Sequence, residues 1–292
     1  MLDQLVLNKY GYYELQDMPS EEELAEWYAT QYYQDCPIKS YEKSYTKAEI
    51  EYFFNKIEQK FIIVGKLAGP NANRFLDIGC GEGWALSYFS QKGWDITGLD
   101  YSAFGCERHN SDCVEFLVQG NVLHNTAMLV KDARTFDCIW LDNVLEHVTD
   151  PLALLENIRQ LMSPGGVLMI DVPNDFSKVQ KELLDRGLVS KPYWFAPFEH
   201  VSYFNKDGLL SLCEDANLKC RLVMTDYPID FALFGALTNY VETSGVGRAC
   251  HLQRVEIENF LHRQSPEKTN RLYEVMADLG IGREIIGFFI LT

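Results

Sequence analysis

Two acidic residues follow consecutive apolar stretches at a spacing that suits a nucleoside. Residues 75–84 read FLDIGCGEGW, an apolar stretch that runs into three closely spaced glycines. Glycine lets the backbone turn sharply and lets a bound group approach it closely. Asp100 ends the next apolar stretch, about 20 positions after Gly79, where a carboxylate can accept hydrogen bonds from both ribose hydroxyls. The pattern predicts a site for a nucleoside-bearing cofactor.

The residues around the glycines argue against two common nucleotide sites. A dinucleotide site carries a third glycine where this chain has Trp84, and the GxxxxGK[ST] phosphate loop is absent from the sequence. Asp77 stands two residues before the first glycine, where its carboxylate would repel a pyrophosphate but attract an ammonium or sulfonium group. The sequence therefore favours a cationic nucleoside cofactor.

Strand-like and helix-like segments alternate around these residues. Alternation of this kind predicts an α/β, Rossmann-like fold in which helices cover both faces of a mostly parallel sheet, here of seven strands. Ligands bind such sheets at the carboxyl ends of the strands, where both acidic residues lie. The expected strands are residues 74–79, 94–100, 114–119, 136–141, 166–172, 219–225 and 284–291, and the clearest helices are 151–162 and 206–216.

Three regions add to this alternating core, and we expect one structural domain overall. Residues 1–73 are predicted to be mostly helical and are rich in tyrosine, which suits either partly buried helix packing or a lid over a ligand. The core, residues 74–292, is expected to contain an aromatic, loop-like insertion at about 173–205 and a helical insertion at about 226–280.

Four motifs in order across residues 74–172 resemble those of class I S-adenosylmethionine-dependent methyltransferases. They are LDIGCGEG at 76–83, LDYS at 99–102, QGNV at 119–122 and FDCIWLDNVLEHV at 136–148. The resemblance implies that Asp77 holds the amino group of the donor, that Asp100 binds the ribose, and that Tyr101 and Asn121 contact the adenine. The family often has Asp where Asn121 stands, and Asn keeps a carbonyl acceptor there. The remaining cofactor-binding residues it implies are Gly79, Cys80, Gly81, Val122 and Leu141.

Two histidines are candidates for proton removal from a methyl acceptor. Glu146 and His147 follow the fourth strand directly, and His200 lies in a later loop. Histidine is the usual base near neutral pH, although either residue could instead hydrogen-bond its loop. A third reading is a divalent metal held by Asn143, Glu146, His147 and His200, an arrangement that resembles small-RNA 2′-O-methyltransferases and quinone-ring O-methyltransferases. Asn143 replaces a glutamate of that pattern and removes one charge.

Segments between residues 173 and 251 resemble methyltransferases of bacterial surface-polysaccharide and modified-sugar pathways. This resemblance implies a small hydroxylated acceptor, such as a sugar or glycan precursor, and O-methylation by in-line transfer. The polar residues that could contact a sugar or its phosphate are Asn174, Asp175, Arg248, His251 and Arg254. The sequence leaves open the acceptor's identity, the target atom, metal dependence and the oligomeric state.

The amino-acid composition argues against some classes of binding partner. The net charge of −16 opposes nucleic-acid binding, and no apolar run approaches a membrane span. Eight cysteines without a CxxC pair predict a reduced, cytoplasmic protein. Two alternatives stay open: a metal-assisted RNA 2′-O-methyltransferase, and a cofactor-binding regulator without catalysis.

Overall fold

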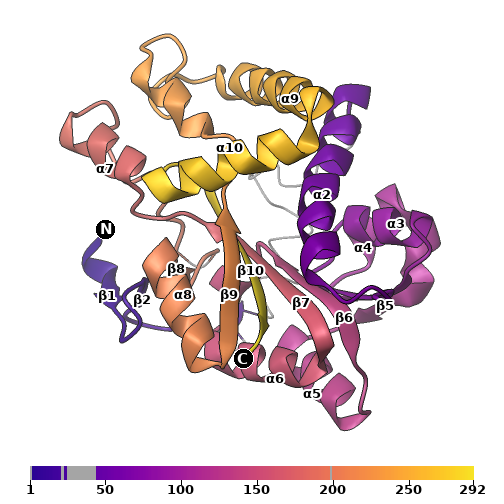
Figure 1. Ribbon diagram of the computed structural model, residues 1–292. Coiled ribbons are helices and arrows are strands. Elements are labelled where there is room, and N and C mark those ends of the chain that lie inside the picture. Colours follow the sequence, from indigo (N-terminus) through magenta and orange to yellow (C-terminus); the bar gives the residue numbers. More distant parts are fainter. Residues whose placement is uncertain (1, 21–22, 25–43, 198) are drawn as a thin grey trace.

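The computed structural model describes residues 2–20, 23–24, 44–197 and 199–292. Within them a seven-stranded sheet has the order β5-β4-β3-β6-β7-β10-β9 (Figure 1). The pairs from β5 to β7 are parallel, and β10 is antiparallel to both of its neighbours, which confirms the predicted α/β fold. The strands are β3 (Arg74–Ile78), β4 (Asp95–Asp100), β5 (Leu117–Gln119), β6 (Phe136–Asp142), β7 (Met162–Pro173), β9 (Leu218–Met224) and β10 (Glu284–Leu291).

The order of the strands places the ligand cleft. The chain continues from β3 to β4 and β5 on one side of β3, and it then returns to β6 and β7 on the other side. Loops that leave β3 and β6 therefore diverge at the carboxyl edge of the sheet. A crevice at such a switch point is the usual ligand site of open α/β sheets.

Helices cover both faces of the sheet because each presents an apolar stripe to it. Figure 1 shows α2, α3 and α10 on one face and α5, α6 and α8 on the other. The helices are α2 (Lys47–Leu67), α3 (Trp84–Gln91), α4 (Phe104–His109), α5 (Val122–Lys131), α6 (Pro151–Leu161), α7 (Lys178–Asp185), α8 (Lys206–Asp215), α9 (Gly247–Gln264) and α10 (Pro266–Leu279), with short 3-10 turns at Leu2–Gln4, Ser111–Phe116, Leu145–His147 and Ile229–Phe234.

The prediction of a mostly helical N-terminal region is wrong for its first residues. Strands β1 (Leu5–Leu7) and β2 (Tyr13–Leu15) pair antiparallel, and β2 also pairs with β8 (Ser202–Tyr203). This small sheet packs around buried Leu15, Val201 and Tyr203, which are too far apart in sequence for periodicity to connect them. The region does contain a long helix, α2, which begins with a capping box between Thr46 and Glu49. Of the tyrosines that suggested a lid, Tyr28, Tyr32, Tyr33 and Tyr41 lie outside the described residues.

Three segments differ from the sequence prediction in extent. Strand β7 begins at Met162 because residues 163–166 form a bulge, with Gly165 in the left-handed region (φ 79°). Residues 114–116 belong to a 3-10 turn and not to β5. The stretch expected as loop contains α7, whose capping box joins Ser177 and Gln180. The predicted helices of 226–280 and the last strand are confirmed.

The structure also bears on two expectations from composition, the absence of membrane spans and the state of the cysteines. Among the described residues, no helix combines the length and the apolar character needed to cross a bilayer. The described cysteines are all free and, apart from Cys220, buried, while Cys36 lies outside the described residues.

Candidate active site

The turn between β3 and α3 requires glycine. Gly79, Gly81 and Gly83 all have positive φ, at 74°, 52° and 75°. A Cβ at Gly79 would lie 2.3 Å from the Cγ2 atom of Val144, so a side chain there would be both strained and obstructed. The turn therefore keeps its backbone open to the cleft.

Asp100 lies against this turn, as its spacing suggested. Its two carboxylate oxygens accept hydrogen bonds from the backbone N–H groups of Gly81 (2.9 Å) and Ser102 (3.0 Å). The backbone N–H of Gly120 donates to the Asp100 carbonyl oxygen at 2.9 Å, which brings the 119–122 motif to the same place. A carboxylate oxygen can accept more than one hydrogen bond, which is the property a ribose-binding residue needs.

The adenine-side candidates take different positions. Asn121 is the N-cap of α5, where its side-chain oxygen accepts from the His124 backbone N–H at 3.0 Å. Val122 is buried beside it, and Tyr101 directly follows Asp100. The Leu141 side chain packs in the apolar core on the α5 and α6 face of the sheet, so what it offers the cleft is its backbone.

Asp77 is buried at the end of β3, with 3% of its surface exposed. Burial, reinforced by the nearby carboxylates of Asp142 and Asp100, raises its pKa to about 8. Together with Gly79 and Cys80 it lines a cavity of about 390 Å³. A neutral buried carboxyl of this kind is ready to ionise when a cation arrives.

The side chains of Glu146, His147 and His200 lie close together in the structure. They come from two distant parts of the chain: Glu199, the neighbour of His200, is 52 positions after His147 and accepts a hydrogen bond from it. The 3-10 turn Leu145–His147 carries the first two, and the Val201 backbone N–H donates to the Glu146 carbonyl oxygen at 2.9 Å. The two imidazole rings lie 4.9 Å apart between centroids. The potential ligand atoms of these three side chains lie within 4.8 Å of one another.

The hydrogen bond of His147 fixes its tautomer. Its Nδ1 atom lies 2.5 Å from the Glu199 carbonyl oxygen. A carbonyl oxygen can only accept, so Nδ1 carries the proton and Nε2 holds the lone pair. Nε2 lies 3.7 Å from Oε1 of Glu146. A bare Nε2 suits both a general base and a metal ligand.

Burial sets the charge of this group. It lowers the pKa of His147 to about 4, and burial together with His147 lowers the pKa of His200 well below the usual range. Burial, reinforced by nearby acidic residues such as Asp175, raises the pKa of the Glu146 carboxyl well above its usual range. At neutral pH both imidazoles are therefore uncharged.

Asn143 does not share a helical turn with Glu146 and His147, as the metal reading supposed. It has a left-handed backbone (φ 54°) before the 3-10 turn begins. Its side chain donates to Asp142 at 3.0 Å and lines the cavity beside Asp77. The sharp turn after β6 interrupts the i, i+3, i+4 relation.

Buried polar atoms without a hydrogen-bond partner among the described residues gather around the histidines. Electrostatic contacts connect their side chains: Glu146 with Asp175, Tyr203 with Asp175, and His200 with Arg283. We call this group the polar chamber. Arg283 Nη1 and Asp175 Oδ1 form an ion pair at 3.9 Å. The atoms that lack a hydrogen-bond partner are both carboxylate oxygens of Glu146 and of Asp175, Nδ1 of His200, the Tyr203 hydroxyl and Nη1 of Arg283.

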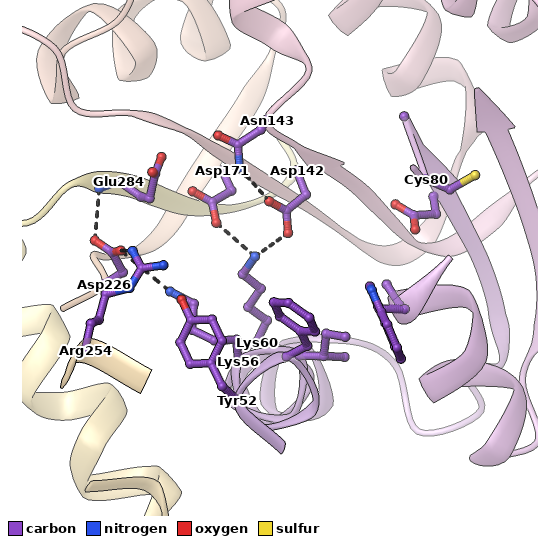
Figure 2. A pocket seen from close by; sticks show the side chains of 16 residues that line it. Tyr52, Lys56, Lys60, Cys80, Asp142, Asn143, Asp171, Asp226, Arg254 and Glu284 are labelled. Carbon is purple, nitrogen blue, oxygen red and sulfur yellow. Dashed lines mark hydrogen bonds and ion pairs between the residues drawn. The ribbon is translucent and has the colours of Figure 1, made fainter. Parts of the chain in front are cut away.

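A second feature escaped the sequence reasoning. Figure 2 shows Lys60 of α2 reaching both Asp142 at the end of β6 and Asp171 near the end of β7. The Asp171 contact is 2.9 Å, and 5% of the lysine side chain is exposed. A lysine four residues after Lys56, on the apolar face of α2, was the available signal.

The remaining polar candidates are distributed over both regions. Arg254 lines the cavity beside Asp226. Arg248 and His251 instead bind Glu49 at the start of α2, at 2.5 and 3.3 Å, and so fasten α9 to α2. Asn174 donates to the Gly282 carbonyl oxygen at 3.1 Å, which is a structural role.

The family model and two curated relatives that match this chain all describe methyltransferases. A family model described as a methyltransferase domain matches residues 45–223, more than half of the chain. Ubiquinone biosynthesis O-methyltransferase of Haemophilus ducreyi is 26% identical over 166 residues, covering 53% of this chain and 69% of that protein. The enzyme of the same name from Leptothrix cholodnii is 26% identical over 171 residues, covering 57% and 70%.

Among solved structures, a SAM-dependent methyltransferase from Archaeoglobus fulgidus has a TM-score of 0.50 at 15% identity. The match covers 80% of this chain and 93% of that one. At this identity the likeness concerns the fold alone.

Proposed function

The chain belongs to the methyltransferase-domain family and is an S-adenosylmethionine-dependent methyltransferase, and from that premise we propose that it methylates a hydroxyl group of a small polyhydroxylated acceptor, such as a sugar or glycan precursor. The observation that carries the proposal is the neutral His147, which carries its proton on Nδ1 and lies beside a group of buried polar atoms that lack hydrogen-bond partners among the described residues.

The residues of the donor side suit this cofactor. When bound, S-adenosylmethionine supplies an activated methyl group on a cationic sulfur. Gly79 and Asp77 line the cavity at this turn, where the amino-acid part of the donor would lie and Asp77, once ionised, would bind its ammonium group. Asp100, which lies against this turn, would accept hydrogen bonds from the ribose hydroxyls, and Asn121 at the start of α5 would border the adenine.

Proton removal is assigned to His147. As the acceptor oxygen gains the methyl group, His147 takes the hydroxyl proton at Nε2, and Glu199 holds the ring through Nδ1. The resulting imidazolium gains a partner when Glu146, at 3.7 Å, ionises. His200, whose ring lies against His147, limits the orientations that the base can adopt. Such positioning and proton transfer are the tasks left to the enzyme when the donor is already activated.

The polar chamber supports a polyhydroxylated acceptor. Its carboxylates can only accept when ionised, whereas Arg283 can only donate. A sugar hydroxyl both donates and accepts, so neighbouring hydroxyls satisfy both kinds of group. The curated relatives are named as O-methyltransferases, which supports oxygen as the target atom.

Metal assistance is a second mode, favoured by the clustering of the same side chains. Glu146, His147 and His200 would hold the ion, which would lower the pKa of an acceptor hydroxyl. Two imidazoles and one carboxylate are ligands that suit zinc better than magnesium.

The test is methyl transfer to a panel of free and nucleotide-linked sugars, detected as mass gain of one methylene. We expect turnover with at least one sugar, lost in His147→Ala and kept in a control variant of the exposed His124, His124→Ala. Chelator treatment separates the modes: unchanged turnover supports the base, and loss restored by zinc supports the metal. Full turnover of both His147→Ala and His200→Ala would contradict the assignment.

A further inference from the structure

The cavity beside the glycine turn extends well beyond the donor residues. It continues from Asp77 and Gly79 along the ends of β6, β7 and β10 to α9, with α2 as its floor (Figure 2). Three aromatic side chains form one wall, and the rings of two of them, Phe53 and Trp84, lie 5.5 Å apart between centroids. The third is Tyr52. The mechanism above does not use this part of the cavity.

Carboxyl groups outnumber basic groups along its walls. Lys60 is shared between Asp142 and Asp171. Lys56 and Arg254 both lie 3.8–4.0 Å from Asp226 and from Glu258, a carboxylate just behind the wall. The lining carboxylates are Asp77, Asp142, Asp171, Asp226 and Glu284, and the lining cations are Lys56, Lys60 and Arg254.

Two of these carboxylates have an oxygen without a hydrogen-bond partner among the described residues. They are Oδ1 of Asp171, a residue that is 3% exposed, and Oε2 of Glu284. Figure 2 shows both residues on the cavity wall above Lys60. Once these carboxyls are ionised they only accept hydrogen bonds, so a ligand that completes the wall in that state donates them. A buried negative charge is also costly unless a positive charge accompanies it.

We propose that this cavity binds an ammonium group of the methyl acceptor, so that the acceptor class is a hydroxylated amine such as an amino sugar. The carboxyl groups supply hydrogen-bond acceptors and, once ionised, negative charge, and the face of Trp84 suits a cation. The ring of Tyr52 already has Lys56 and Arg254 over it, at 5.9 and 5.3 Å. The proposal rests on the proposed function, since the loop that begins at Asp142 and Asn143 also carries Glu146 and His147.

The protonation of the wall makes binding depend on pH. Burial raises the pKa of Asp171 to about 7, although Lys60 opposes the shift, and burial with Asp171 and Asp226 raises the pKa of Glu284. An ammonium ion must displace these protons, so its affinity rises as the pH increases through 7. The other charged groups facing them are Asp142, Lys56, Arg283 and Glu146.

Three small probes that share one hydroxyl-bearing skeleton test the charge preference directly. Ethanolamine, ethylene glycol and glycolate are titrated by ligand-observed NMR into protein saturated with S-adenosylhomocysteine. We expect ethanolamine to bind about tenfold more tightly than ethylene glycol, and more tightly at pH 8 than at pH 6. Glycolate should bind most weakly.

Two variants test whether the carboxylate of Glu284 causes the preference for ethanolamine. Glu284→Gln should remove most of the ethanolamine preference, whereas Glu256→Gln, which removes an exposed carboxylate on α9, should keep it. The pH series on the unaltered protein serves if Glu284→Gln does not fold. Equal affinity for ethanolamine and ethylene glycol, or an unchanged preference in Glu284→Gln, would overturn the proposal.

The outcome is separable from that of the proposed function because probe binding needs no methyl transfer. Ethanolamine binding without turnover of any sugar would reject the proposed function and keep the site. Turnover of neutral sugars without an ethanolamine preference would reject the ammonium site alone.

Discussion

The donor turn and the polar chamber lie on the same sheet edge but differ in how their polar atoms are satisfied. At the donor turn, both oxygens of Asp100 already hold the loop through Gly81 and Ser102. In the chamber, both oxygens of Glu146 and of Asp175 have no hydrogen-bond partner among the described residues. One region is held by hydrogen bonds from its own backbone, and the other contains buried polar side chains whose hydrogen-bonding capacity the described residues do not fill.

This difference indicates which of the two regions is already in the conformation that binds a ligand. A preformed turn binds its ligand with little rearrangement, because the hydrogen bonds that shape it exist already. Unsatisfied buried polar groups each cost about 1–3 kcal/mol, which a ligand with matching groups recovers. Acceptor recognition should therefore depend more steeply on single side chains than donor recognition does.

The largest expected effect comes from removing the base. His147→Ala should lower kcat by about 10²–10⁴-fold, the usual contribution of a positioned general base. Donor affinity, measured by calorimetry, should change less than twofold. Because the pKa of His147 lies near 4, the unaltered enzyme should keep its kcat, measured at saturating donor and acceptor, within about twofold between pH 7.5 and 5.5. A fall centred near pH 6.5 would assign proton removal to a different, exposed histidine.

The next effect concerns Lys60, which joins α2 to the ends of β6 and β7. Lys60→Met leaves Asp142 and Asp171 without their cation and should lower the free energy of unfolding by about 3 kcal/mol. Urea denaturation measures it, with Lys66→Met on the exposed face of α2 as the control. A loss below 1 kcal/mol would mean that the two carboxyls are protonated at no cost.

Replacing Asp77 should affect donor binding and protein stability in opposite directions. Asp77→Asn should weaken donor binding by about 10–100-fold, the value of a hydrogen bond to a charged group. The raised pKa means that the folded state holds a proton which the unfolded state releases, so the unaltered protein loses stability as the pH rises from 4 to 8.

The Asn variant lacks this penalty. The free energy of unfolding of Asp77→Asn minus that of the unaltered protein should increase as the pH rises to about 8. Above about pH 8 this difference should stay constant. Denaturation at several pH values measures the difference, and parallel profiles for the two proteins would show that Asp77 is ionised in the fold.

The smallest effect is expected at Asn121, where one side chain serves the fold and the ligand. Asn121→Ala removes the N-cap of α5 and should cost about 1 kcal/mol of stability. Asn121→Asp keeps the cap and should restore it. Donor affinity should fall in the Ala variant and stay within twofold in the Asp variant, which calorimetry tests. Equal affinity in all three proteins would remove Asn121 from the adenine site.

Sequence reasoning predicted the β3–α3 turn and Asp100 at the end of the next strand because the signals for both are local. The glycines of the β3–α3 turn and the carboxylate of Asp100 occupy strand ends, where short patterns determine the backbone. The seven strands followed from the same alternation of apolar and polar residues. The bulge in β7 was missed because Ser163, Pro164 and two glycines indicate a break, and α7 was missed because the aromatic residues of 173–205 were interpreted as a loop.

The acceptor side was only partly predicted because its residues meet through tertiary contacts. His147 and His200 were singled out by residue type, but their shared geometry depends on the Glu199 carbonyl and the β2–β8 pairing. Lys60 and Arg283 carry no local motif, since their positions follow from how α2 and β10 pack against the sheet. No pattern in one sequence specifies such packing.

The most direct test of the account is a crystal structure with S-adenosylhomocysteine bound. We predict the sulfur above Gly79, with the ribose on Asp100 and Nε2 of His147 facing the sulfur at about 6 Å, the room for one acceptor oxygen. A ligand whose sulfur points away from His147, or a dinucleotide across the glycine turn, would contradict it.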